Sequence, residues 1–308
     1  MSTPDPHAAL RVAVTGSTGL IGTALVGALR AGGHRVLRLV RSRPAPGGDE
    51  VYWSPSRGEI DADALEGTDA VVHLAGENVG QPPWTEERKR RILDSRVQGT
   101  GLLARTLAGL AAKPRVLVSA SAVGYYGDRG DEVLDESSAS GSGFLAEVCR
   151  AWEAAADPAR EAGIRVVHPR MGVVLSGEGG ALGKMLTPFK LGVGGKMGSG
   201  RQWMSWVALH DVVEAVRFAI GTDALSGPAN LTSPNPATNA EFTEALGRVL
   251  GRPTFFSVPG FALKLALGQM ADEALLASQR AVPEKLREAG FVFEYPDLEG
   301  ALRAALGR

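Results

Sequence analysis

The chain has 308 residues, of which 44% are hydrophobic, and 33 basic and 34 acidic side chains give a formal net charge of −1. This composition excludes a mainly disordered chain, and the near-neutral charge argues against nucleic acid as a partner. The single cysteine, Cys149, excludes an intrachain disulfide and suits a reducing, cytoplasmic location. No run of about 18 apolar residues occurs, so we expect no membrane partner.

Strand-like and helical patterns alternate along the first 175 residues. Nearly continuous apolar, β-branched runs predict buried parallel strands at 11–15, 34–40, 69–75, 114–120 and 164–169. Helical periodicity between these runs predicts helices at Leu20–Ala31, 85–110 and 143–156. This alternation is typical of an α/β protein with a Rossmann-type doubly wound parallel sheet.

The pattern changes after residue 175, where glycine-rich loops interrupt the chain. Helices are predicted at 209–220 and 237–251, the second with Thr238 or Asn239 as its N-cap. We therefore expect a cofactor-binding domain at 1–175, its sheet completed by parts of 205–232. A smaller, mostly helical substrate or cap region is expected at 176–308.

A glycine-rich loop joins the first predicted strand to the first predicted helix. Its glycines, Gly16, Gly19 and Gly22, have the spacing of a dinucleotide-binding loop in the strand–turn–helix context that this motif requires. The first permits a tight turn, the second a close approach of backbone to pyrophosphate, and the third close helix–strand packing. Free N–H groups at the helix start then face the anion. The predicted cofactor contacts here are Gly16, Thr18, Gly19, Leu20, Ile21 and Gly22.

The end of the second predicted strand indicates which dinucleotide is bound. An acidic residue about 20 positions after the glycines would hold a ribose 2′-hydroxyl, but this strand ends in Val40-Arg41-Ser42. A guanidinium at Arg41 suits a 2′-phosphate. We therefore expect Arg41 and Ser42 to contact the cofactor and NADP(H) to be favoured over NAD(H). Arg38 and Arg43 are expected to be solvated.

Several further motifs share a common pattern with one known superfamily. They are TGSTGLIG (15–22), HLAGEN (73–78), RVQGT (96–100), SASAVGYYG (119–127), FLAEVCRAWEAA (144–155) and GSGRQWMSWVALHD (198–211). With these motifs the chain resembles the extended short-chain dehydrogenase/reductase superfamily. Within it, the chain is similar to the nucleoside-diphosphate-sugar epimerase-like "epimerase family protein" subgroup, which carries a C-terminal domain of unknown function.

This resemblance implies further cofactor contacts beyond the glycine loop. Leu74, Ala75 and Gly76 end a strand and are implied to border the adenine-ribose and pyrophosphate side, although simple strand packing explains the first two equally well. Ser119 is implied to lie near the nicotinamide. Arg96 replaces the family's usual asparagine, and we favour a contact with cofactor or substrate over a solvated arginine.

The resemblance also implies a catalytic tyrosine–lysine pair, which this chain lacks. Phe144 and Val148 occupy the matching positions, and neither side chain can titrate. Ser121 matches the family's catalytic serine. Tyr125 or Tyr126 is the candidate proton donor, with a packed ring as the competing interpretation for each.

Candidate substrate contacts come from both halves of the chain. They are Glu77, Phe144, Met204 and Trp206. Met204 stands where sugar-nucleotide members have an arginine that grips a diphosphate, so we expect a substrate with less negative charge. For Glu77 an exposed loop carboxylate, and for Trp206 a core position, are the competing interpretations. The five histidines have no ligand-like spacing, so no metal site is predicted.

These observations lead to two functional hypotheses. The first is an NADP-binding oxidoreductase or epimerase-type enzyme that acts on an unknown small molecule. The second is an inactive NADP(H)-binding sensor or regulatory protein, because the catalytic pair is missing. The oligomeric state is left open, with a homodimer as one option.

Overall fold

A nine-stranded sheet forms the centre of the computed structural model, which describes residues 9–45 and 47–308. Its strand order is β14-β9-β6-β5-β1-β2-β3-β4, with β7 beside β9, and all pairs are parallel except β3–β4. The strands are β1 (Arg11–Thr15), β2 (Arg35–Val40), β3 (Glu50–Ser54), β4 (Glu59–Ile60), β5 (Ala70–His73), β6 (Val116–Ser119), β7 (Ser121–Ala122), β9 (Arg165–Met171) and β14 (Gly227–Leu231). The predicted doubly wound parallel sheet is confirmed.

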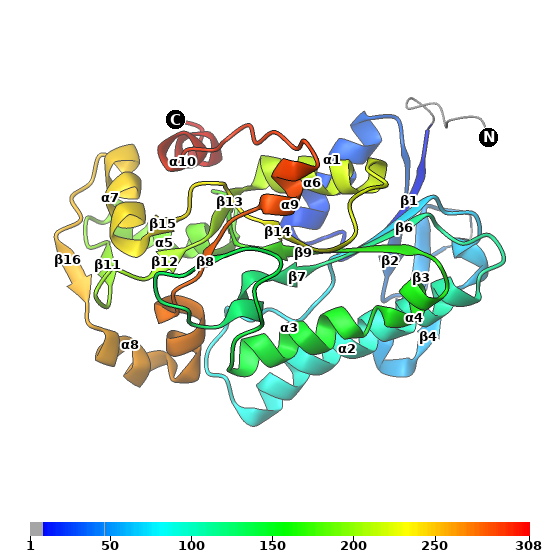
Figure 1. Cartoon of the computed structure of the whole chain (residues 1–308), viewed down its shortest axis with the longest axis horizontal. Helices are drawn as coiled ribbons and strands as arrows, with labels where there is room; N and C mark the ends of the chain where they lie inside the picture. Colours follow the sequence, from blue (N-terminus) through cyan, green and yellow to red (C-terminus); the bar gives the residue numbers. More distant parts are fainter. Residues whose placement is uncertain (1–8, 46) are drawn as a thin grey trace.

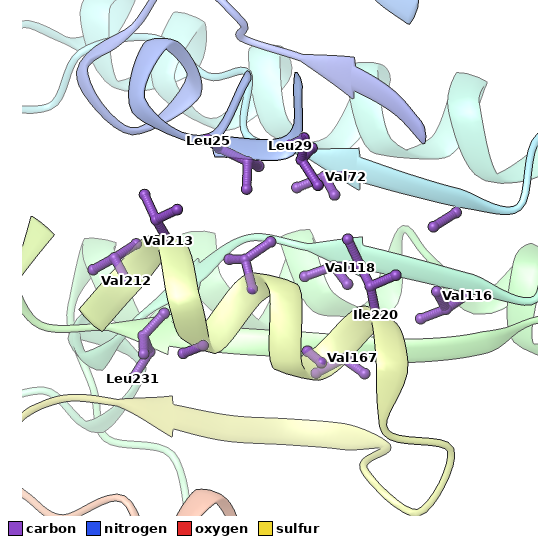
Figure 2. Packing of buried hydrophobic residues seen from close by; sticks show 14 of the residues in the cluster. Leu25, Leu29, Val72, Val116, Val118, Val167, Val212, Val213, Ile220 and Leu231 are labelled. Carbon is purple, nitrogen blue, oxygen red and sulfur yellow. The ribbon is translucent and has the colours of Figure 1, made fainter. Parts of the chain in front are cut away.

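Helices cover both faces of this sheet (Figure 1). One face carries α1 (Leu20–Ala31) and α6 (Leu209–Gly221), and the other carries α2 (Glu86–Gly109), α3 (Phe144–Ala154) and α4 (Asp157–Glu161). Alternate residues along each strand face opposite layers, so Val12 and Val14 of β1 pack towards α1 whereas Ala13 packs towards α2. Figure 2 shows Leu25 and Leu29 of α1 beside the sheet and Val213 of α6 above β6 and β9.

The helix boundaries follow local sequence signals closely. The first predicted helix has the observed bounds of α1, and Thr85 caps α2 by accepting the N–H of Arg88. In α7 (Asn239–Leu250), Thr238 is the N-cap and forms a capping box with Glu241. The predicted N-cap at Thr238 or Asn239 is thus resolved in favour of Thr238.

Four two-stranded sheets and further helices complete the fold, and those at the left of Figure 1 form a C-terminal lobe. The pairs are β10 (Val173–Leu175) with β13 (Trp206–Ala208), β11 (Gly195–Met197) with β16 (Phe256–Val258), β12 (Trp203–Met204) with β15 (Ala237–Thr238), and β8 (Val133–Leu134) with β17 (Arg280–Ala281). The remaining helices are α5 (Gly180–Lys190), α8 (Gly260–Leu267), a π-helical turn (Ala271–Leu276), α9 (Glu284–Glu288) and α10 (Leu298–Leu306).

This lobe is joined to the sheet at more than one place. β14 belongs to the central sheet, and β8, which precedes α3, pairs with β17 near the end of the chain. The division into units at residue 175 stays a prediction. Across residues 9–45 and 47–308, no helix is both long and apolar enough to span a bilayer.

Candidate functional site: a dinucleotide cleft at the switch point

The strand order reverses direction between β1 and β5, and the glycine loop lies at this point. β2 and β3 follow on one side of β1, whereas β6 and β9 follow β5 on the other side. In open α/β sheets, ligands bind outside the carboxyl ends of the strands at such a switch point. The glycine loop after β1 and residues 74–76 after β5 leave the sheet here.

The glycines of this loop are required by contacts that a larger residue would break. Gly16 has φ +64°, and a Cβ on it would lie 2.9 Å from the backbone nitrogen of Ala75. A Cβ on Gly22 would lie 2.8 Å from the Gly16 carbonyl carbon and closer still to its oxygen. Gly19 is the N-cap of α1, and no side chain caps this helix. The N–H groups of the first turn therefore remain available to an anion, and the loop fits a dinucleotide pyrophosphate.

The hydroxyl of Thr15 fixes the loop after β5 against the glycine loop. Its oxygen accepts the backbone N–H groups of Leu74 at 3.1 Å and Ala75 at 3.2 Å, and it lies 2.7 Å from Nδ1 of His73. Because the oxygen already accepts two N–H groups, its own proton points to Nδ1, and His73 carries its proton on Nε2. Leu74 and Ala75 are thus placed beside Gly16.

His73 is fully buried beneath this junction. Burial, and then the nearby Arg96 charge, lower its pKa to about 4. Its Nε2 has no hydrogen-bond partner among the described residues, and its ring meets Trp53 edge-on at 5.7 Å between centroids. His73 is therefore neutral at pH 7.

We expect His73 to make the protein acid-sensitive. Its folded pKa lies below the ordinary value of about 6.5, so the free energy of unfolding falls as pH drops from 6.5 towards 4, by about 3 kcal/mol at most. His73→Asn keeps an acceptor near Thr15 but cannot titrate, so denaturant unfolding at pH 7, 6, 5 and 4 should show a shallower loss. The exposed His210→Asn is the control. Identical pH profiles for wild type and His73→Asn would contradict this expectation.

Arg96 organises the loop that contains Glu77. Its Nη1 donates to the carbonyl oxygens of Glu77 at 3.1 Å and Ile92 at 3.0 Å, and its guanidinium lies 4.8 Å from the ring centroid of Trp152. The Glu77 carboxylate lies 3.5 Å from Arg88. The guanidinium also packs against the backbone of Gly76, 3.3 Å from where a Cβ would stand. A direct contact of Arg96 with the cofactor stays a prediction.

The end of β2 presents two different arginines. Arg41 and Ser42 are exposed and directly follow the strand. The sequence predicted a solvated Arg38, but in the structure this side chain makes two contacts. It donates from Nε to Oγ of Ser17 in the glycine loop at 3.2 Å, and it pairs with Glu50 at 3.5 Å. Arg38 therefore braces the loop, and Arg41 is left facing solvent beside it.

A buried ion pair lies behind the ends of β6 and β7. Arg170 binds Glu153 through two hydrogen bonds of 2.8 and 2.9 Å, and Ser121 donates to the same carboxylate at 2.7 Å. Burial opposes ionisation of Glu153, but the Arg170 bonds and charge outweigh it, so its pKa lies below the ordinary value. Ser121 is only 2% exposed, and a catalytic role for it stays a prediction. Ser119 is fully buried, and its Oγ has no partner among the described residues.

The two adjacent tyrosines have opposite environments. Tyr126 is fully buried, its oxygen lies 2.7 Å from Asn230 Oδ1, and it accepts a hydrogen bond from Arg170 at 3.1 Å. Burial raises its pKa to about 12, and a role for Tyr126 as proton donor stays a prediction. Tyr125 is half-buried with Arg170 stacked 3.4 Å from its ring centroid, and its hydroxyl has no partner among the described residues.

Phe144 is the first residue of α3. Its ring meets Trp84 edge-on at 5.3 Å between centroids, and Val148 one turn later is buried. The carboxylate of Glu273, from the π-helical turn, accepts the N–H groups of Phe144 at 3.1 Å and Leu145 at 2.8 Å. A carboxylate from late in the chain thus accepts the first N–H groups of α3.

The two remaining substrate candidates lie in different environments. Met204, in β12, is half-buried, and its sulfur lies 3.4 Å from Nδ2 of Asn239. Trp206 is fully buried among apolar residues of α5, α7 and α10. This burial favours the competing interpretation of Trp206 as a core residue, and its contact with substrate stays a prediction. Residues 9–45 and 47–308 hold no group of three side chains suited to bind a metal ion.

Sequence reasoning missed four residues that organise this site. They are Arg38, Glu153, Arg170 and Glu273. Glu153 offered a weak signal, since a carboxylate on the third predicted helix faces the sheet with Val148 and Cys149. The others are defined by contacts between distant segments, which local spacing does not encode.

Comparison with known sequences identifies two families in the chain. Residues 12–230 match the NAD dependent epimerase/dehydratase family, and residues 258–305 match a domain of unknown function, DUF1731. An "Epimerase family protein" of Mycobacterium tuberculosis is 49% identical over 96% of this chain and 98% of its own length. The human "Epimerase family protein SDR39U1" is 37% identical over 96% of this chain and 99% of its own length.

Comparison with solved structures gives a consistent result. Human SDR39U1 (isoform 2), solved with NADPH, superposes with a TM-score of 0.86 at 35% identity, covering 97% of this chain and 99% of that one. A nucleoside-diphosphate sugar epimerase from Corynebacterium glutamicum gives a TM-score of 0.81 at 42% identity over 98% of this chain. This chain spans only 59% of the length of the Corynebacterium protein.

Proposed function

The chain belongs to the NAD dependent epimerase/dehydratase family, and from this premise we propose that it is an NADP(H)-dependent oxidoreductase or epimerase-type enzyme acting on a small substrate. The observation that carries the proposal is the uncapped N-terminus of α1 beside residues 74–76. The NADPH in the human SDR39U1 structure supports it. A cytoplasmic location is part of the same proposal and rests on the buried free thiol of Cys149.

Tyr125 is the proposed proton donor. When bound, the nicotinamide supplies a hydride equivalent to a carbonyl carbon. Tyr125 would donate its hydroxyl proton to the carbonyl oxygen, so that an alcohol results, while Arg170 fixes the ring. Of the two tyrosines, only Tyr125 combines partial exposure with a hydroxyl that has no partner among the described residues.

Tyr125→Phe is expected to lower turnover by about 10²–10⁴-fold, the usual contribution of a positioned acid, with NADPH affinity unchanged. Turnover is measured as NADPH oxidation against a panel of small aldehydes and ketones. Tyr126→Phe is the matched control, and it should cost about 1–3 kcal/mol of unfolding free energy while turnover of the folded protein remains. Equal turnover in wild type and Tyr125→Phe would exclude Tyr125 as the donor.

The cofactor preference is proposed to depend on Arg41. A charge-assisted hydrogen bond to the 2′-phosphate contributes roughly 1.5–3 kcal/mol, so NADPH should bind at least about tenfold more tightly than NADH. Arg41→Ala should remove most of this difference, as fluorescence titration with both cofactors would measure. Arg35→Ala, at the opposite end of β2 and paired with Asp49, is the control. Equal affinities of the wild type for NADPH and NADH would overturn the assignment.

An inactive NADP(H)-binding sensor is the second candidate function. Two observations favour it: the Ser121 hydroxyl is bound to Glu153, and Phe144 and Val148 replace the proton-relay pair. The same turnover assay separates the two functions, because a sensor binds NADPH without oxidising it. The substrate class is also a proposal. Met204 offers no charged donor to a diphosphate, so we expect a neutral or modestly charged ligand.

A further inference from the structure

The C-terminal lobe carries a concentrated set of exposed apolar side chains. Among the described residues, nine large hydrophobic side chains are exposed, and seven of them come from two short segments, 191–193 and 255–265. These seven, which we call the aromatic face, are Leu191, Val193, Phe255, Phe256, Val258, Phe261 and Leu265. The parallel pairing of β11 with β16 brings the two segments together, at the left of Figure 1.

Most of the aromatic face is not packed against other residues of the protein. Phe255 is 92% exposed, Phe261 75% and Leu265 88%, and α8 buries none of its residues. Phe261 and Leu265 are four residues apart on α8 and so share one side of the helix. No residue from 253 to 263 is charged, so no side-chain charge in this stretch repels another chain.

The exposed apolar area of these segments could supply part of a protein–protein interface, with Phe255 and Phe256 on opposite sides of the extended chain. A buried phenylalanine covers 150–250 Å², so the exposed fractions of Phe255, Phe256 and Phe261 amount to roughly 450 Å² of apolar surface. The two leucines and two valines extend it. The largest apolar patch on a typical monomer is about 300–600 Å², and each partner in a standard interface contributes about 800 Å².

β16 adds a feature that favours a second copy as the partner. Among residues 9–45 and 47–308 its pairing partner is β11 alone, so its other edge is open to these residues, and Phe256 to Val258 are all exposed. An open strand edge without lysine or another charge is a template for pairing with an identical strand. Lys264 is paired with Asp272 at 2.6 Å, so the one charge on α8 is already neutralised.

We propose that the aromatic face is a symmetric homodimer interface, in which β16 and α8 of one copy pack against the same elements of a second copy. A twofold axis makes such an interface isologous, so that the same patch serves both subunits. Antiparallel pairing of two β16 edges about this axis places the two Ser257 residues opposite each other. The interface lies outside the dinucleotide cleft and is independent of the proposed function.

The first test measures the oligomeric state of the full chain by sedimentation equilibrium across a concentration series. We expect a dimer, and we expect Phe255→Glu and Phe261→Glu each to weaken it about 30-fold or more, as for a central interface aromatic. Both side chains are exposed, so these variants should fold, which circular dichroism checks. Val292→Glu is the control, because Val292 is 84% exposed but lies beside Leu10 and Arg115. A monomer at all concentrations, or a dimer indifferent to both substitutions, would overturn the proposal.

A second test reports on the geometry. Ser257→Cys, treated with a short bismaleimide, should yield a covalent dimer, whereas Val292→Cys should not; the native Cys149 is buried. Vesicles of phosphatidylcholine with one quarter phosphatidylglycerol test the competing partner. If the protein is monomeric and floats with these vesicles, and if the Phe261→Glu variant no longer does so, the aromatic face binds a membrane surface and the dimer is refuted. A dimer that Ser257→Cys does not cross-link would refute pairing through β16.

Discussion

Gly22→Ala is expected to abolish NADPH binding and to lower the free energy of unfolding by about 1–3 kcal/mol, the usual cost of overpacking. A Cβ at this position would lie 2.8 Å from the carbonyl carbon of Gly16. The neighbouring atoms are backbone, so the strain is relieved only by moving the glycine loop away from α1. That movement displaces the N–H groups that face the pyrophosphate, so the thermal shift on adding NADPH should disappear.

Gly27→Ala is a matched control for this prediction. Gly27 lies on the same helix, is exposed, and has no other atom within 4 Å of where a Cβ would stand. Alanine is the better helix former, so the free energy of unfolding of this variant should rise by about 0.5–1 kcal/mol. Its thermal shift on adding NADPH should be the same as that of the wild type. Helix propensity favours both substitutions equally. If the free energy of unfolding rises for Gly27→Ala but falls for Gly22→Ala, the difference is therefore due to the contact of the new Cβ with Gly16. A Gly22→Ala protein with normal stability and a normal NADPH shift would contradict this account.

Arg170→Met is expected to cost about 3–5 kcal/mol of unfolding free energy at pH 7, because it leaves Glu153 charged and buried without its partner. The pair is nearly inaccessible, with side-chain exposures of 3% for Arg170 and 14% for Glu153. Arg287→Met, which removes a surface pair with Glu284, should cost less than about 1 kcal/mol. Chemical denaturation of the three proteins measures both effects.

The pH dependence of Arg170→Met gives a sharper test. In the wild type the pKa of Glu153 is lower in the folded than in the unfolded protein. The ion pair therefore stabilises the fold at pH values above the unfolded pKa, and this stabilisation is lost as the pH falls through the folded pKa. Without Arg170, burial is unopposed and raises this pKa. The variant's deficit should therefore shrink as pH is lowered from 7 towards 5. Removing both charges, as Glu153→Leu with Arg170→Met, should cost less than the sum of the single changes. A deficit that is constant with pH would show that Glu153 is not the cause.

Local patterns in the sequence predicted the parts of this molecule that depend on neighbouring residues. The glycine loop, the limits of α1 and the N-cap at Thr238 or Asn239 all follow from residues within one turn of each other. The central strands were recognisable because both of their faces are covered, which leaves an almost unbroken apolar run. The same reasoning could not separate Tyr125 from Tyr126.

The two tyrosines differ through residues far away in the chain. Asn230, 104 residues later, is the hydrogen-bond partner that holds Tyr126 inside, and Arg170 then stacks on Tyr125. The two interpretations of Trp206 could not be separated for a related reason, because the apolar cluster that encloses it is assembled from α5, α7 and α10. In each case the chemistry of the residue type was clear from sequence, while its access to the cleft is set by tertiary packing.

The cap that Glu273 places on α3 has a consequence for synthesis on the ribosome. Phe144 and Leu145 emerge 129 and 128 residues before the carboxylate that binds their N–H groups. β8 likewise can pair with β17 only after Arg280, the partner of Val133, has been synthesised. While the chain is being translated, the start of α3 therefore stays incomplete until residues near the C-terminus have left the exit tunnel. A nascent chain that ends just before residue 273 would carry the whole glycine loop and all nine strands of the central sheet, but it would lack the carboxylate that accepts the first N–H groups of α3.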